Sequence, residues 1–118
     1  MNKILLIDDD EFFRSNLRDA LIGKGYGVIE SNGGNAGLKQ AQIGMPNIVI
    51  TDVVMAEGIG TIMTLRQMAS ELPIIVMSGN EEYLRSVGFL SAMHMLPKPF
   101  HVVELMRLLD QVVAEASE

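Results

Sequence analysis

The 118-residue sequence contains no cysteine, no tryptophan and no long apolar run. The lack of cysteine excludes a disulfide framework and a thiolate metal site, and it is compatible with a reducing compartment. No apolar run approaches the length that a transmembrane helix needs. The amino-terminal segment also lacks the long apolar core of a signal peptide, so we expect a soluble, cytoplasmic protein.

Basic residues are scarce too. Nine Lys and Arg residues face 15 Asp and Glu residues, which gives a net charge of −6 and an isoelectric point of about 4.8. Phosphate backbones and anionic lipids repel such a chain, so we expect neither nucleic acid nor a membrane as a direct partner. The hydrophobic fraction of 48% and the charged fraction of 20% are typical of a globular protein. We therefore expect a single domain over residues 1–118.

Strands and helices are predicted to alternate along the chain. Apolar runs bounded by turn residues indicate buried strands, and a segment with apolar residues at helical spacing follows each run. The second helix is expected to be short and weak. The expected strands cover residues 4–7, 28–30, 47–52, 74–77 and 92–96, and the expected helices cover residues 11–24, 36–44, 61–69, 80–90 and 102–113.

This alternation favours a parallel sheet with right-handed crossovers and with helices on both faces. Pro97 follows the fifth predicted strand. Because proline removes a donor from the strand ladder, it favours that strand at an edge of the sheet. Both features fit an α/β, flavodoxin-like (βα)5 doubly wound parallel sheet with strand order 2-1-3-4-5. In this order ligands bind between the first and third strands.

Carboxylates gather at that predicted binding edge. Asp8–Asp10 follow the first strand, and Asp52 ends the third. Like charges this close repel one another, and such clusters usually persist because a cation binds there; Mg²⁺ is the expected ion. A carboxylate beside a divalent ion can attack phosphorus and form an aspartyl phosphate. Ser78 and Lys98, after the fourth and fifth strands, could then stabilise the phosphoryl oxygens.

Four motifs resemble those of response-regulator receiver domains, the family of the chemotaxis regulators. They are Leu5–Asp10, Ile50–Asp52 with Met55 and Gly60, Val76–Gly79, and Lys98–Phe100. The resemblance covers essentially the whole chain, in order and at nearly the family's spacing. It implies a phosphoacceptor signalling domain of a two-component phosphorelay. The implied partners are a sensor histidine kinase or a histidine phosphotransfer protein and a downstream protein target.

The resemblance also implies an acceptor and a metal site. Asp52 is the implied phosphoacceptor. Asp9 is implied as a direct Mg²⁺ ligand, and Asp8 as an acid that acts mostly through water. The backbone carbonyl of Val54 would complete the protein's share of the coordination.

The implied switch involves the other two motifs. Ser78 would bond a phosphoryl oxygen, and Lys98 would pair first with Asp52 and then with the phosphoryl group. The Lys98–Pro99 peptide bond is implied to be cis. Phosphorylation would bias a pre-existing equilibrium at the face made by the fourth helix, the fifth strand and the last helix.

The sequence departs from the family pattern at several places. Val54 replaces a polar residue that helps to hold the attacking water, so Val54 and Asn80 are expected to tune dephosphorylation. Ala56 stands where proline is usual, and Met95 where an aromatic switch residue is usual. The segment between Ser78 and Lys98 is also slightly shorter than in typical members of the family, which predicts a truncated or irregular fourth helix.

Two other functions stay open at this point. The same fold could serve as a pseudo-receiver, which is a constitutive interaction or dimerisation module. A Mg²⁺-dependent phosphatase with an aspartyl nucleophile is disfavoured, because the residue two positions after Asp52 is not an acid and no cap segment encloses a substrate. We expect a regulatory domain rather than an enzyme, with at most autocatalysed phosphorylation and dephosphorylation. Either a monomer or a phosphorylation-dependent dimer is compatible with the sequence.

Overall fold

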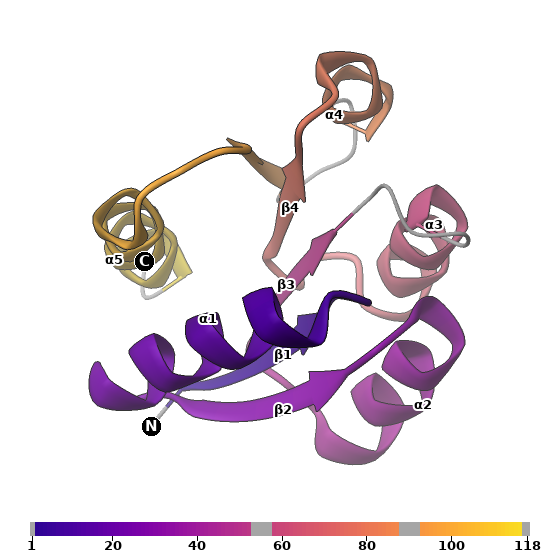
Figure 1. Ribbon diagram of the computed structural model, residues 1–118. Coiled ribbons are helices and arrows are strands. Elements are labelled where there is room, and N and C mark those ends of the chain that lie inside the picture. The colour runs from indigo at the N-terminus through magenta and orange to yellow at the C-terminus, as the bar shows by residue number, and fades with distance from the viewer. Residues whose placement is uncertain (1, 53–57, 88–92, 117–118) are drawn as a thin grey trace.

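The computed structural model describes residues 2–52, 58–87 and 93–116. Within these ranges strands and helices alternate, as the sequence predicted (Figure 1). The strands are β1 (Lys3–Ile7), β2 (Gly27–Ser31), β3 (Ile48–Asp52), β4 (Ile74–Ser78) and β5 (Met93–Pro97). The helices are α1 (Glu11–Gly23), α2 (Gly34–Gly44), α3 (Gly58–Met68), α4 (Glu81–Val87) and α5 (Val102–Ala116).

The five strands form one parallel sheet in the order β2-β1-β3-β4-β5, which confirms the predicted fold class. β5 lies at an edge, as Pro97 indicated. Ile7 of β1 stands opposite Thr51 of β3. Because each of these residues is followed directly by an aspartate, the register brings Asp8 and Asp52 to the same edge of the sheet.

Side chains alternate between the two faces of the sheet along each strand. Both faces are apolar here, and helices cover both of them. In β1, Ile4 and Leu6 belong to one buried cluster, and Leu5 and Ile7 to another. Leucines of α1 and α5 complete the first cluster, and residues of α2, α3 and α4 complete the second. Figure 1 shows α1 and α5 on one side of the sheet, with α2 and α3 on the other.

The helix α2 is longer than the short, weak helix that the sequence predicted for residues 36–44. It begins at Gly34 and runs for 11 residues. A Cβ atom at Gly37 would lie 2.6 Å from Cδ1 of Ile7, so the helix packs closer to β1 than a larger residue would allow. The glycines that lower helix propensity therefore permit a close contact near the carboxyl end of β1.

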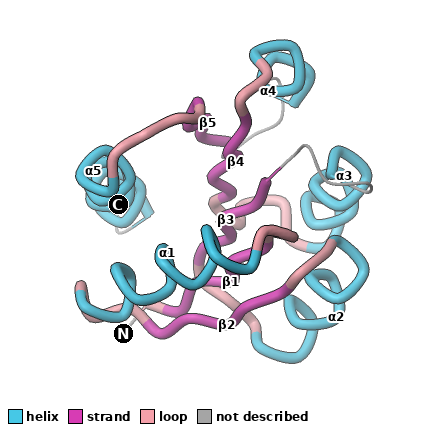
Figure 2. Tube along the Cα trace, viewed as in Figure 1, coloured by secondary structure: helices cyan, strands magenta, loops and turns pink. Residues whose placement is uncertain are grey.

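Other boundaries shift by a few residues. The helix α3 begins at Gly58, three residues before the predicted start, and β5 extends to Pro97. The predicted end of the fourth helix and the predicted start of the fifth strand fall within 88–92, outside the described residues. Among the helices that can be described, none has both the length and the apolar composition of a membrane span. Figure 2 shows the loops that follow β1, β4 and β5. Asp8 and Lys98 belong to two of these loops, whereas Asp52 and Ser78 are the last residues of β3 and β4.

Candidate functional site

Asp8 is the most enclosed acid of the site. Its side chain is 0% exposed, and its Oδ1 accepts a hydrogen bond from the backbone N–H of Asp10 at 2.9 Å. Burial raises the pKa of Asp8, and the repulsion of Asp52 adds to this effect. The N–H of Asp10 and the ammonium group of Lys98 offset only part of the rise in the pKa. A positive charge in this position would therefore relieve an unfavourable buried carboxylate.

The two acids that follow Asp8 have different environments. Asp10 is the N-cap of α1, because its Oδ1 accepts a hydrogen bond from the backbone N–H of Phe13 at 3.0 Å. Asp9 is exposed beside the buried Asp8. Three consecutive aspartates thus supply one buried carboxylate, one exposed carboxylate and one helix cap.

Lys98 joins the two strand ends that carry acids. Its ammonium nitrogen lies 2.8 Å from Oδ2 of Asp52 and 3.5 Å from Oδ2 of Asp8. Partial burial lowers the pKa of Lys98, but its hydrogen bond to Asp52 and the charges of both acids outweigh burial and raise the pKa above 10.5. The ammonium group is therefore charged at neutral pH. The Lys98–Pro99 peptide bond is cis.

Ser78 and Asn80 form a compact turn after β4. Ser78 is buried, and its Oγ accepts a hydrogen bond from the backbone N–H of Asn80 at 3.0 Å. The Oδ1 atom of Asn80 accepts a hydrogen bond from the backbone N–H of Glu82 at 2.9 Å. The backbone N–H of Lys98 donates to the carbonyl oxygen of Ser78 at 2.8 Å. The last residue of β4, which carries the hydroxyl, is thus hydrogen-bonded to the loop that begins with the lysine.

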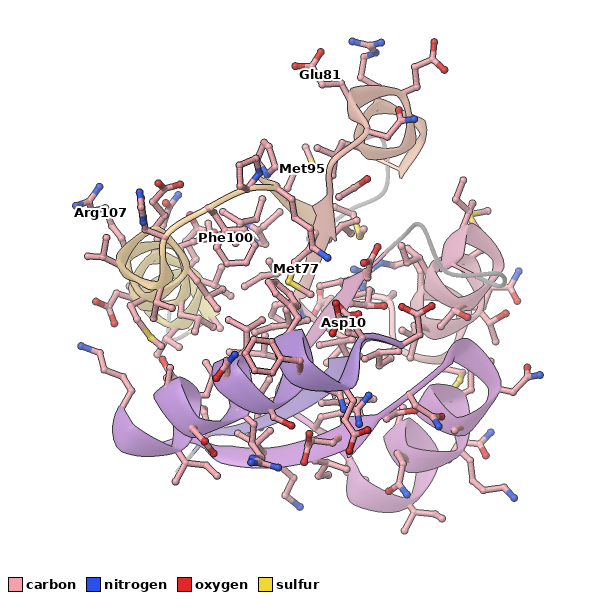
Figure 3. The ribbon with its side chains drawn as sticks, viewed as in Figure 1. Asp10, Met77, Glu81, Met95, Phe100 and Arg107 are labelled. Atoms are coloured by element: carbon pink, nitrogen blue, oxygen red, sulfur yellow. The ribbon has the colours of Figure 1, made fainter. Side chains whose placement is uncertain are left out.

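The other predicted residues lie away from this group or cannot be placed. Met95 is on β5, with 41% of its surface exposed (Figure 3). Val54 and Ala56 lie outside the described residues, so the predicted carbonyl ligand and the predicted loop change have no structural account.

Sequence reasoning missed two side chains of α1. Arg14 donates from Nη1 to the carbonyl oxygen of Asp8 at 2.6 Å and from Nε to Oε1 of Glu30 at 3.1 Å. Phe13 places its ring 4.3 Å from the ammonium nitrogen of Lys98, measured to the ring centroid. The spacing of Arg14 and Arg18 by one helical turn, opposite an acid in the next strand, is the signal that could have found the first contact. No local pattern indicates the second.

The oxygen atoms at this edge fit a hard cation. Across the described ranges, no three His, Asp or Glu side chains are grouped so as to hold a metal by themselves, and the predicted set of Asp8, Asp9 and Asp52 therefore does not form a ready-made cluster. Mg²⁺ does not need such a cluster, because it is usually bound through one or two carboxylates and several waters. The buried Asp8, beside the exposed Asp9, supplies carboxylates of this kind.

Known proteins are similar to this chain in sequence and in fold. The sequence profile of the response regulator receiver domain matches residues 4–110. The DNA-binding transcriptional regulator NtrC of Bradyrhizobium sp. is 32% identical over 119 aligned residues, which are 98% of this chain and 25% of NtrC. The chain thus spans a quarter of the length of that relative.

Two solved structures illustrate the likeness of the fold. The chemotaxis protein CheY4 of Vibrio cholerae has a TM-score of 0.87 and 26% identity, over 95% of this chain and 98% of CheY4. The response regulator TrrA of Thermotoga maritima, in complex with Mg(2+)-BeF, has a TM-score of 0.86 and 24% identity, over 95% of this chain and 99% of TrrA. The structure of TrrA shows the same fold.

Proposed function

We propose that this chain, which belongs to the response regulator receiver domain family, accepts a phosphoryl group on Asp52 and acts as a switch in a two-component phosphorelay. The donor would be a phosphohistidine of a sensor kinase or of a histidine phosphotransfer protein. The observation that carries the proposal is the position of the Lys98 ammonium group, 2.8 Å from Asp52 and 3.5 Å from Asp8. A cation held at an acid is what an incoming phosphoryl group requires.

The chemistry of transfer follows from the groups at the strand ends. A carboxylate oxygen of Asp52 forms a bond to phosphorus while the bond from phosphorus to the imidazole nitrogen breaks, and the imidazole leaves with the electron pair. Negative charge then spreads over the three phosphoryl oxygens. Lys98 can neutralise one of them, and the hydroxyl of Ser78 can donate to another once it leaves its 3.3 Å contact with the carbonyl of Asn80.

Mg²⁺ is the proposed cofactor. Asp8, Asp9 and Asp52 would hold it through oxygen atoms and water, together with the carbonyl of Val54. When bound, it would reduce the repulsion between the carboxylates and the phosphoryl group. The complex of TrrA with Mg(2+)-BeF supports this proposal, since that protein has the same fold.

Phosphorylation would change the partner of Lys98. The ammonium group would leave the carboxylate of Asp52 for a phosphoryl oxygen and draw on the loop Lys98–His101, which leads into α5. We therefore propose that the face formed by α4, β5 and α5 changes its population of conformers and binds a downstream protein.

The test is phosphorylation by a small-molecule donor. The protein is incubated with acetyl phosphate and Mg²⁺, and its intact mass is measured. We expect the mass of one phosphoryl group on the parent and none on Asp52→Asn. Asp10→Asn is the matched control, because asparagine also caps helices and this variant should still be phosphorylated. A parent that stays unmodified would support the pseudo-receiver instead, and sustained release of phosphate from many substrates would support the phosphatase.

A further inference from the structure

The ammonium group of Lys98 has a third neighbour besides its two acids. The ring of Phe13, in the first turn of α1, lies 4.3 Å from the ammonium nitrogen, measured to the ring centroid. The ring of Phe13 also packs against the ring of Phe100 in an edge-to-face arrangement, with 5.9 Å between the ring centroids and 79° between the ring planes. We propose that Phe13 is a positioning residue that holds the Lys98 ammonium group in front of Asp52 and Asp8. This role rests on the proposed function of Asp52.

The need for such a residue follows from the chemistry of lysine. Its charge sits at the end of a flexible four-carbon stem, so the ammonium group can occupy several positions while it keeps a single ion pair. The face of an aromatic ring attracts a cation, whereas an aliphatic side chain of similar size does not. Asp52 and Asp8 lie 2.8 Å and 3.5 Å from the nitrogen, and the ring adds a third attachment that is not a hydrogen bond. The ring thereby helps to hold the ammonium nitrogen of Lys98 without accepting a hydrogen bond from it.

The ring itself is held from two sides. Asp10 accepts the backbone N–H of Phe13 at 3.0 Å, which fixes the first turn of α1. Phe100, two residues after Lys98, packs against the ring in an edge-to-face arrangement. Figure 3 shows Asp10 at the start of α1 and Phe100 in the loop before α5. The loop between β5 and α5 therefore supplies both the ammonium group of Lys98 and the ring of Phe100, and both of these contact the ring of Phe13.

Phe13 also packs against the core cluster between α1, α5 and the sheet, so a purely structural role must be distinguished from positioning. Leucine preserves apolar packing but has no aromatic face, and tyrosine preserves the face. Phe12 offers a matched control, because it is the same residue type, directly precedes Phe13 in the same helix and is 79% exposed.

The experiment is a double-mutant cycle of Phe13 and Lys98, in which the affinity for beryllofluoride is measured in the presence of Mg²⁺. We expect Phe13→Leu to weaken binding by roughly threefold to tenfold, the range that a cation–π contact provides. Phe13→Tyr should bind like the parent, and so should Phe12→Leu. In a Lys98→Ala background, Phe13→Leu should cause no further loss, because there is no ammonium group left to position. The same loss in both backgrounds would show that Phe13 acts only on packing, and the proposal would be overturned.

A second readout does not depend on phosphoryl chemistry. The ammonium protons of Lys98 should exchange with water faster in Phe13→Leu than in the parent, and Phe12→Leu should leave the rate unchanged. Unchanged exchange in Phe13→Leu contradicts the positioning role. A parent that binds neither beryllofluoride nor phosphate, but shows this difference in exchange, would refute the proposed function and leave the role of Phe13 intact.

Discussion

The ammonium nitrogen of Lys98 lies 2.8 Å from Oδ2 of Asp52, although 46 positions separate the two residues in the sequence. Asp52 ends β3 and Lys98 follows β5, so the contact crosses the end of β4, which lies between these strands. The contact links the proposed phosphoacceptor directly to the loop that leads into α5. A change in charge at Asp52 therefore acts directly on this lysine.

Replacing Asp8 should stabilise the fold in the absence of a divalent ion. Because folding raises the pKa of Asp8, the folded protein binds its proton more tightly than the unfolded chain does. Ionisation of Asp8 thus begins to cost stability as the pH rises above the ordinary value of 3.8, and the full cost is present above the raised pKa. In the absence of divalent ions at neutral pH, Asp8→Asn should gain about 1 kcal/mol, or roughly 4 °C in Tm.

Thermal unfolding of parent and Asp8→Asn at neutral pH and below pH 3.8 provides the measurement. The gain should shrink at the acidic pH, where the parent's Asp8 is protonated in both states. An increase in Tm of the same size at both pH values would mean that the shape of the asparagine side chain, and not the loss of the charge of Asp8, stabilises the variant.

Asp9→Ala should weaken Mg²⁺ binding and suppress phosphorylation while unfolding stays cooperative. The exposed carboxylate of Asp9 contributes little to packing, but each carboxylate that is lost leaves the ion more fully hydrated and more weakly bound. Titration with Mg²⁺, followed by amide chemical shifts near Asp52, measures the affinity. Asp19→Ala is the control, because it also removes one exposed acid but lies in the second half of α1, away from the site. Parent-like Mg²⁺ affinity in Asp9→Ala would rule out its role as a ligand.

Lys98→Ala should still accept some phosphate but lose the switch. Without the ammonium group, the charge at Asp52 has no direct contact with the loop before α5. In the parent, we expect beryllofluoride with Mg²⁺ to shift the amide resonances of residues 100–104, and in the variant these shifts should largely vanish. Lys24→Ala, at an exposed position, should respond like the parent. Equal responses in Lys98→Ala and in the parent would show that the signal takes another route.

Arg14 should matter more than Arg18, although both bind Glu30. Arg14 also donates to the carbonyl oxygen of Asp8, and its side chain is 14% exposed against 35% for Arg18. Arg14→Gln should therefore cost about 1 to 2 kcal/mol of unfolding free energy, whereas Arg18→Gln should cost clearly less, because water screens its exposed ion pair. Chemical denaturation of both variants is the measurement. Equal losses would mean that the bond to Asp8 adds nothing to stability.

The lifetime of the phosphorylated state should depend on Val54 and Asn80. Hydrolysis needs a water held in line with the bond to phosphorus. Val54 offers no hydrogen bond to such a water, and the Oδ1 of Asn80 accepts the N–H of Glu82 at the start of α4. We expect Val54→Asn to accelerate loss of label from the phosphoprotein by about tenfold. If Val54→Asn decays like the parent and Asn80→Ala decays much more slowly, Asn80 alone holds the water.

Local patterns were sufficient for most of the fold. Four-residue apolar runs such as Ile4–Ile7 and Ile74–Met77 predicted buried strands, and Pro97 predicted that β5 lies at an edge. The pattern underestimated α2, because helix propensity counts each glycine as a loss. At Gly37 the loss is compensated by a contact with Ile7 that only the packed structure contains.

The sequence by itself determined which residue types reach the carboxyl edge of the sheet. Strand periodicity and the alternation with helices are local properties, and parallel strands bring their following residues, Asp8 and Asp52 among them, to one side. Tertiary structure alone decided what each of these residues does there. Asp8 is buried, Asp9 is exposed and Asp10 caps a helix, although the three are adjacent and identical. The contacts of Lys98 with Asp52 and with the ring of Phe13 likewise exist only after the sheet has formed, because they join side chains from elements far apart in the sequence.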